Sequence, residues 1–259
     1  MTQAPFPERS VPDSGPEGDP PAEVLPILYR DDRLVVVDKP SGLLVHRSMI
    51  DRHERRFAVQ ILRNQLGQRV YPAHRLDKGT SGALAFALDR EGATGLATQF
   101  STGEVRKKYV AVVRGWPEPS GVIDHPLEPV ADDVLGPQPG GPRESRSTFR
   151  TLVTIELPHR VDRYPTSRYA LVELEPLTGR RHQLRRHLAH ASHPIVGDST
   201  YGKGRHNRLF RDLFGSHRLL LACTQLAFRH PVSGAAVVVD APLADDFATV
   251  VRQLGWACP

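Results

Sequence analysis

Short runs of β-branched and aromatic residues, separated by Pro- and Gly-rich turns, dominate the hydrophobic pattern of this chain. Residues 25–42 hold two such runs around a polar Asp-Asp pair and end in the turn sequence PSG, which predicts a β-hairpin. Five further strands are predicted on the same grounds. They cover residues 107–115, 147–157, 168–177, 217–228 and 235–242. Strands that follow one another in this way favour an antiparallel sheet.

Three segments have apolar residues at helical spacing and are predicted to be helices. They cover residues 57–66, 180–191 and 244–254. Stretches rich in Pro and Gly at residues 126–147 and 158–165 are typical of loops, and loops of such length often handle a ligand. Strands clustered with a few helices, without a repeated βαβ rhythm, indicate the α+β class.

The start of the chain differs in composition from the rest. Residues 1–21 contain six prolines and two glycines with scarcely an apolar side chain to bury, which predicts disorder. We assign residues 1–25 to a disordered N-terminal tail and residues 26–259 to one folded domain. The 39% apolar content of the chain is sufficient to build a packed core.

Cysteine usage and hydropathy indicate the cellular compartment. Cys223 and Cys258 lie far apart and fit neither a disulfide scaffold nor the spacing of a zinc finger. No apolar run reaches the roughly 18 residues needed to cross a bilayer, and the first residues lack the apolar core of a signal peptide. We therefore expect a cytoplasmic protein without membrane contact.

Positive charge is concentrated in one part of the chain. The net charge is +5, and between Arg180 and Arg211 eight Lys or Arg residues stand against a single acid, Asp198. Such a patch binds polyanions because each phosphate that it neutralises releases counterions. A solvated surface face is the other reading, and the patch alone does not decide between them.

A second chemical feature is the sequence HRLD, residues 74–77, followed by KGTSG. It places Asp77 next to an arginine in a polar turn just before the apolar run ALAFAL, and a loop against a buried strand is a rigid platform for a functional group. An aspartate in this position can also simply cap the turn through its side chain. The tetrapeptide leaves both roles open.

Five sequence blocks together resemble the RluA family of pseudouridine synthases. The blocks are KPSG at residues 39–42, HRLD with TSG, Lys108-Tyr109 in RKKYVAVVRG, TGRRHQLRRHL, and HPIVGD. They occur in the family's order and run from about residue 27 to about residue 240. The resemblance implies the pseudouridine synthase fold, a mainly antiparallel mixed sheet flanked by helices and loops, and chemistry without metal or cofactor.

Further segments resemble a branch of this family that modifies tRNA. They include VHRSMIDRHE, GPQP and the final GW. This narrower resemblance implies a tRNA uridine as substrate, at position 65 where the T-stem meets the acceptor stem, and a monomer without an S4-type RNA-binding module. A ribosomal RNA uridine remains an alternative substrate. A non-catalytic RNA-binding protein with this fold is the alternative from another class, and loss of Asp77 would be its expected mark.

The resemblance also implies roles for individual residues. Asp77 is the carboxylate that starts the reaction, by attack on the ribose, by attack on C6 of the uracil or by assisting departure of the base, and Arg185 holds it ionised. Tyr109 stacks on the target base and is a candidate for proton transfer at C5, and Arg75 enters the RNA as the uridine leaves the helix. The structural alternatives are a packed strand tyrosine for Tyr109, a surface arginine for Arg185, and a salt bridge across the loop for Arg75.

A second set of residues is expected to bind RNA or line the substrate pocket. The set consists of His74, Arg180, Arg181, His182, Gln183 and Leu221. In one segment the chain departs from the family, because Ala222 stands where relatives commonly have His. Any role of that histidine is absent, and we expect Cys223 beside it to be an unreactive core thiol.

Two other chemistries have weaker support. Several histidines between His182 and His193 suggest a metal site, but their spacing matches no HExxH or Cys/His pattern. Glu173 and Glu175 suggest a glycosidase pair, but on a strand they would project from one face too near each other for the usual separation of about 5 Å or more. We expect these glutamates to lie on a solvent-facing strand.

Overall fold

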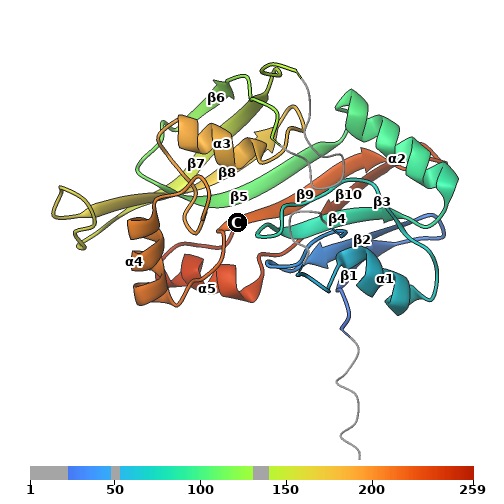
Figure 1. Ribbon diagram of the computed structural model, residues 1–259, viewed down its shortest axis with the longest axis horizontal. Helices are drawn as coiled ribbons and strands as arrows, with labels where there is room; N and C mark the ends of the chain where they lie inside the picture. The colour runs from blue at the N-terminus through green and yellow to red at the C-terminus, as the bar shows by residue number, and fades with distance from the viewer. Residues whose placement is uncertain (1–22, 48–52, 131–139) are drawn as a thin grey trace, which may run out of the picture.

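The computed structural model describes residues 23–47, 53–130 and 140–259. Within these ranges ten strands form one sheet, and five helices lie against it (Figure 1). The strands are β1 Ile27–Arg30, β2 Leu34–Lys39, β3 Tyr71–Pro72, β4 Ser81–Ala87, β5 Arg106–Arg114, β6 Ser120–Asp124, β7 Arg146–Leu157, β8 Ser167–Pro176, β9 Leu221–Arg229 and β10 Ala236–Asp240. The helices are α1 Ala58–Leu66, α2 Arg90–Thr102, α3 Gln183–His190, α4 Gly204–Phe214 and α5 Asp245–Gln253.

The sheet is mixed but mainly antiparallel. Its strand order is β1-β2-β4-β9-β5-β8-β7-β6, with β10 paired to β9 and β3 paired to β4. Only the β4–β9 pairing among these strands is parallel, and it joins Ser81 to Ala222 and Gly82 to Cys223. The observed sheet confirms the predicted α+β class and the mainly antiparallel mixed sheet.

Most predicted elements are confirmed. The hairpin forms as β1 and β2, the five further strands form as β5, β7, β8, β9 and β10, and the three helices form as α1, α3 and α5. Two helices and the short strands β3 and β6 escaped prediction. Helix α2 contains two glycines and mostly polar residues, and α4 lies in the segment read only as a basic patch.

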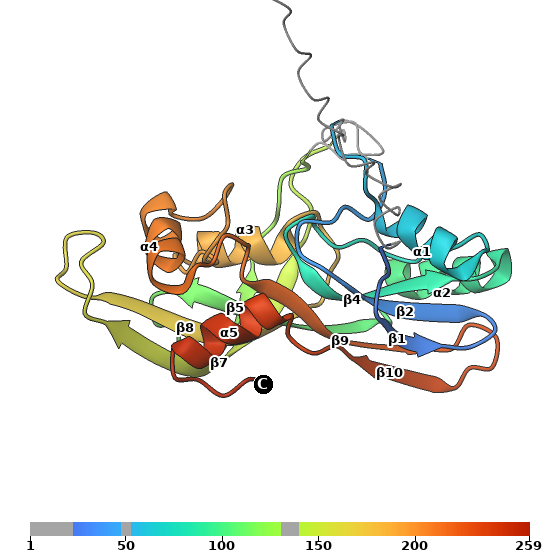
Figure 2. The ribbon, with the colours of Figure 1, turned by 90° about the horizontal axis from the view of Figure 1, so that it is seen from below.

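Apolar residues alternate between the two faces of the central strands. On β5, Ala111 and Val113 join a core cluster with residues of α1, α2 and α3, whereas Val110 and Val112 join a second cluster with residues of α4 and α5. Alternation of this kind follows from the two-residue period of a strand. Figure 2 shows α3 and α5 on opposite sides of the sheet.

The beginning of the folded part can be placed from Leu25. Residues 1–22 of the predicted tail lie outside the described residues. Leu25 is buried, and its backbone exchanges two hydrogen bonds with the Gln65 side chain, at 2.8 and 3.0 Å. The fold therefore includes Leu25, one residue before the predicted boundary. In the described ranges, the helices are too short or too polar to span a bilayer.

Gly82 makes the parallel β4–β9 pairing possible. Its φ is +105°, and a Cβ at this position would lie 2.1 Å from the carbonyl oxygen of Cys223. Only glycine lets the two backbones approach so closely. The glycine of the TSG sequence is thus the residue that fixes the loop carrying Asp77 against β9.

We predict that Gly82→Ala lowers the free energy of unfolding by at least about 3 kcal/mol, because it adds both steric overlap and backbone strain. Urea unfolding of the purified protein measures the change. Gly67→Ala is the matched control, since Gly67 also has a positive φ, +67°, but open space around its Cα. We expect a loss of about 1 kcal/mol there, and equal losses at both positions would contradict the steric explanation.

Candidate active site

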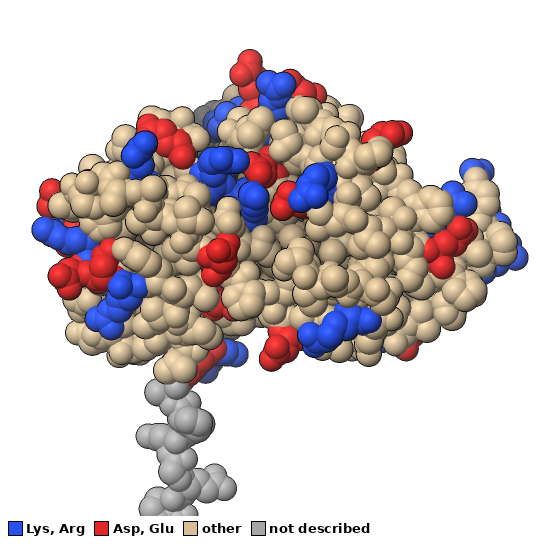
Figure 3. All heavy atoms as spheres, turned by 180° about the vertical axis from the view of Figure 1, so that it is seen from behind, with Lys and Arg blue, Asp and Glu red and all other residues tan. Residues whose placement is uncertain are grey.

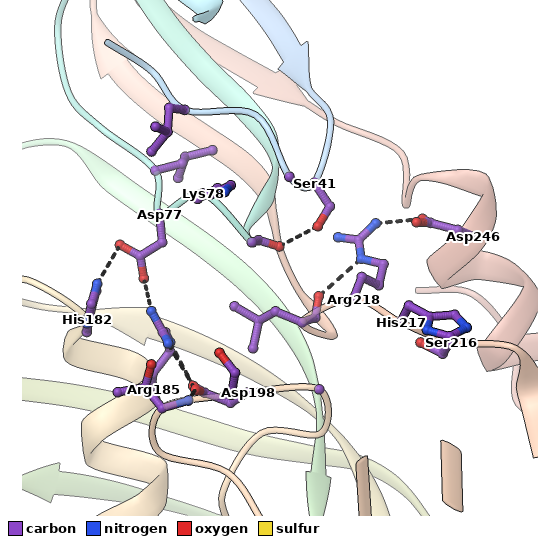
Figure 4. A pocket seen from close by; sticks show the side chains of 18 of the residues that line it. Ser41, Asp77, Lys78, His182, Arg185, Asp198, Ser216, His217, Arg218 and Asp246 are labelled. Atoms are coloured by element: carbon purple, nitrogen blue, oxygen red, sulfur yellow. Dashed lines mark hydrogen bonds and ion pairs between the residues drawn. The ribbon is translucent and has the colours of Figure 1, made fainter. Parts of the chain in front are cut away.

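Asp77 lies in the loop between β3 and β4, and its carboxylate points away from the turn. The turn is closed by backbone, because Thr80 N–H donates to the main-chain carbonyl of Asp77 at 3.0 Å. The carboxylate instead faces two side chains of the opposite wall (Figure 4). Arg185 Nη1 donates to it at 3.1 Å, and His182 Nε2 lies 3.8 Å away. Asp77 thus uses its side chain for an ion pair and not for a turn cap.

Arg185 on α3 connects two carboxylates. While Nη1 reaches Asp77, Nε and Nη2 donate to the two oxygens of Asp198 at 2.7 and 2.9 Å. A bidentate pair of this kind fixes the plane of the guanidinium. Asp198 is fixed in turn, because it also accepts the backbone N–H groups of Thr200 and Tyr201. The side of Arg185 that faces Asp77 is therefore held in one orientation.

The charges of this triad reinforce one another. Burial opposes ionisation of Asp198, but the hydrogen bonds from Arg185 and from backbone amides outweigh it and lower the pKa of Asp198. For Arg185 burial again works against the charged form, and the two carboxylates raise its pKa above the ordinary value. Arg185 is therefore a permanent cation beside Asp77.

His182 and Gln183 shape the start of α3. The predicted helix began at residue 180, but the observed helix begins at Gln183 because His182 adopts a left-handed conformation with φ +54°. The buried Gln183 amide accepts from Arg180 N–H at 2.9 Å and donates to Ser147 at 2.9 Å. The structure therefore gives Gln183 internal partners that hold this turn against β7.

His182 itself faces the carboxylate in its neutral form. Burial and the nearby arginines Arg185 and Arg181 lower its pKa, although Asp77 acts in the opposite direction. Its Nδ1 lies 3.1 Å from the hydroxyl of Tyr201, which sets the position of the ring. A neutral imidazole next to Asp77 leaves Arg185 as the cation that pairs with the carboxylate.

Tyr109 and Leu221 come from neighbouring strands, β5 and β9, and line one cavity with Asp77. Tyr109 is 8% exposed, and burial raises the pKa of its hydroxyl well above the ordinary value, with Cys223 and Asp77 adding to the effect. Burial also raises the pKa of the Cys223 thiol to about 12. This agrees with the expectation of an unreactive core thiol.

Two adjoining cavities meet at Asp77. The larger has a volume of about 980 Å³ and reaches past Asp198 to the start of α5, and the smaller has about 460 Å³ and contains Tyr109 and Leu221. Both volumes lie in the range typical of ligand sites. Six residues line both cavities, namely Arg75, Leu76, Asp77, Arg181, His182 and Arg185. The carboxylate is accessible from either side.

His74 and Arg180 are placed differently from one another. Burial lowers the pKa of His74 to about 3, its Nε2 accepts the N–H of Ala85 at 3.1 Å, and its ring stacks on Phe100 with centroids 4.6 Å apart. Arg180 lies on the surface and donates to the carbonyl of Glu144 at 3.1 Å while lining the smaller cavity. His74 thus contributes an uncharged side chain to the wall of the smaller cavity, and Arg180 contributes a positive charge at its rim.

Lys39 is a part of the site that the sequence analysis missed. It is fully buried, and its Nζ donates to the carbonyls of Pro40 and Leu43 at 2.8 Å each. Burial lowers its pKa to about 7. Next to it, Gly42 N–H donates to the carbonyl of Lys78 at 2.8 Å. The KPSG turn therefore supports the loop immediately after Asp77, which explains why two distant sequence blocks belong to one site.

Asp198 was also missed, although the sequence contained a signal. It is the single acid in the basic segment 180–211, and it is 2% exposed. A buried acid within such a segment needs a cationic partner. The two glutamates considered as a glycosidase pair have surface partners instead. Glu173 pairs with Arg150 at 3.1 Å, and Glu175 pairs with Arg106 at 3.6 Å.

Comparison with known proteins identifies the family. Residues 33–190 match the model of a family described as RNA pseudouridylate synthase. The chain belongs to the RNA pseudouridylate synthase family. Among its relatives, proteins named tRNA pseudouridine synthase C are 45% identical in Vibrio parahaemolyticus and in Salmonella typhi. The matches cover 90% of this chain and 96% and 91% of those proteins, respectively.

Solved structures support the same assignment of this pseudouridylate synthase. Human RNA pseudouridylate synthase domain containing 4 superposes with a TM-score of 0.68 at 26% identity, covering 90% of this chain and 94% of that one. Human RNA pseudouridylate synthase domain containing 1 gives 0.63 at 26% identity, covering 92% and 98%. The family resemblance, the pseudouridine synthase fold and the isomerase activity predicted from sequence are confirmed.

We predict that Asp198→Asn lowers the free energy of unfolding of this pseudouridylate synthase by about 3–5 kcal/mol at neutral pH, because it breaks a buried ion pair. The folded-state pKa of Asp198 lies below its unfolded value of about 3.9, so its contribution is present above that pH and is lost as the pH falls through the folded value. Urea unfolding at pH 7 and pH 3 should therefore show a large difference from wild type that narrows in acid.

Asp212→Asn is the matched control for this substitution. Asp212 also pairs with an arginine, Arg211, at 3.5 Å, but its side chain is 61% exposed. We expect a change of less than about 1 kcal/mol. A loss at Asp198 as small as the loss at Asp212 would contradict the structural role of the Arg185–Asp198 pair.

Proposed function

We propose that this pseudouridine synthase isomerises a uridine of tRNA, at position 65 where the T-stem meets the acceptor stem, and that it works in the cytoplasm. Support for a tRNA substrate comes from relatives named tRNA pseudouridine synthase C that are 45% identical over 90% of the chain. The observation that carries the catalytic proposal is the ion pair between Asp77 and Arg185, 3.1 Å apart at the junction of two cavities.

Asp77 starts the reaction in this proposal. The bond between N1 of the uracil and C1′ of the ribose breaks, the base turns, and a bond from C5 to C1′ replaces it, while C5 loses a proton and N1 gains one. The carboxylate attacks the ribose or C6 of the uracil, and both steps require its ionised form. Arg185 orients the carboxylate for either step through its hydrogen bond of 3.1 Å.

Tyr109 and Leu221 would enclose the uracil beside Asp77. Both line the smaller cavity, and Tyr109 offers an aromatic ring for stacking. Its hydroxyl stays protonated at neutral pH because burial raises its pKa, so it cannot accept the proton that leaves C5 unless a second group takes its own proton. The stacking role is therefore the one that the geometry favours.

The target uridine must leave the RNA helix before Asp77 can reach it. Unstacking costs a few kcal/mol, and a side chain that fills the vacated space lowers this cost. Arg75, two residues before Asp77, lines both cavities and is half-buried at their junction. We assign it the filling role, with Arg180 and Arg181 contacting phosphates at the rim.

We predict that the wild-type protein forms one pseudouridine in unmodified tRNA, at position 65, and none in ribosomal RNA fragments. Carbodiimide-dependent stops of reverse transcription map the product in both substrates, and a reaction without enzyme gives the background. Product only in the ribosomal fragments would contradict the tRNA assignment. Binding of tRNA without any product would contradict the enzymatic one.

A further inference from the structure

The smaller cavity extends beyond the residues assigned to the uracil. Past Tyr109 it is walled by Ala97, Phe100 and Ser101 of α2 and by Lys107 of β5. Lys107 and Tyr109 are two residues apart on one strand, so their side chains project from the same face about 6.6 Å apart along it. This extension is therefore continuous with the proposed uridine site and lies on its α2 side.

Lys107 differs from its two basic neighbours on β5. Arg106 pairs with Glu175 at 3.6 Å, and Lys108 pairs with Glu173 at 4.0 Å. Across the described residues, Lys107 has neither a carboxylate within ion-pair distance nor a hydrogen-bond acceptor, and its contact is with the ring of Phe100, 5.9 Å from Nζ to the centroid. Burial lowers its pKa. A half-buried ammonium without an anion is costly unless a ligand supplies one.

The residues that line this cavity include no unpaired acid that could balance Lys107. Five Lys or Arg residues line this cavity, namely Arg75, Lys107, Arg180, Arg181 and Arg185. Its single acid, Asp77, is paired with Arg185. On the rear face of the molecule, by contrast, Lys and Arg are interspersed with Asp and Glu (Figure 3). A neutral uracil would leave the charge of Lys107 unbalanced, so the cavity is suited to a further, negatively charged group.

We propose that Lys107 binds a backbone phosphate adjoining the target uridine, and that the Phe100 side of the cavity receives the neighbouring nucleotide. The inference rests on the proposed RNA substrate. Phe100 is suited to this place because His74 stacks on it and fixes its ring, and an aromatic ring beside a cation is the usual platform for a nucleotide of single-stranded RNA. The enzyme would thus hold two consecutive nucleotides.

The test compares the affinity of two proteins for unmodified tRNA. The parent carries Asp77→Asn, which prevents turnover, and the variant carries Lys107→Met in addition. We expect the dissociation constant to rise about tenfold, and the slope of log K against log salt to lose about one unit, because one phosphate contact is removed. Lys108→Met is the matched control, since this adjacent lysine has Glu173 as its partner. Its affinity and slope should equal those of the parent.

A second arm tests whether the contact is with a phosphate. In tRNA ligated from synthetic pieces, one uncharged methylphosphonate linkage replaces the phosphate on the 5′ or the 3′ side of the target uridine. One of the two replacements should weaken binding of the parent and leave Lys107→Met unchanged. Equal weakening of both proteins by each replacement would overturn the proposal.

Two measurements distinguish failure of this inference from unfolding of the variant and from failure of the proposed function. The thermal unfolding temperature of Lys107→Met should be no lower than that of the parent, because an unpaired half-buried charge is removed. Lys107→Arg, which keeps the positive charge, should restore binding. Pseudouridine formation by protein with Asp77 intact is followed in parallel. If product forms but Lys107→Met keeps the parental affinity and salt slope, the phosphate site is wrong and the proposed function stands. Absence of product overturns the proposed function itself.

Discussion

The site depends on one guanidinium that is shared between two carboxylates. Arg185 is held by both oxygens of Asp198 and offers its remaining nitrogen to Asp77 at 3.1 Å. A single ion pair between Asp77 and a flexible arginine would fix neither partner. Here Asp198, itself held by backbone amides, makes the cation rigid, and the cation in turn orients the carboxylate of Asp77.

The rest of the fold brings the two sides of this ion pair together. Helix α3 supplies Arg185, and the loop before β4 supplies Asp77, 108 positions apart in the sequence. The parallel β4–β9 pairing, which requires Gly82, places that loop against the strand that carries Leu221. The buried ammonium of Lys39 holds the KPSG turn beneath it. Backbone contacts therefore determine where the carboxylate lies, and Arg185 determines its orientation.

Sequence alone predicted the sheet well because its strands follow a two-residue hydrophobic period that depends on local spacing. It failed where the structure depends on contacts distant in sequence. Helix α2 is capped by Asp89 and packs through Leu96, but its glycines hide the helical pattern. The start of α3 is delayed by the left-handed His182, which no propensity indicates. A fully buried lysine such as Lys39 is rare, so burial of that side chain could not be expected from composition.

The family blocks pointed to the residues that we propose as catalytic, but not to the residues that support them. Asp77, Arg185 and Tyr109 do meet in one site, but Asp198 was recognised only as an exception in a basic segment. Position within a motif gives the identity of a reacting group. It does not give the second carboxylate that orients the cation, because that contact joins two different blocks, TGRRHQLRRHL and HPIVGD, through the fold.

Asp77→Asn tests the central claim most directly, because it removes the negative charge with almost no change in shape. We expect the variant to bind unmodified tRNA as tightly as wild type within about threefold, with pseudouridine reduced below detection. Glu54→Gln, which alters a partly exposed acid paired with Lys78 beside the same loop, should keep wild-type activity. Pseudouridine formation by Asp77→Asn at a rate near that of wild type would contradict the account.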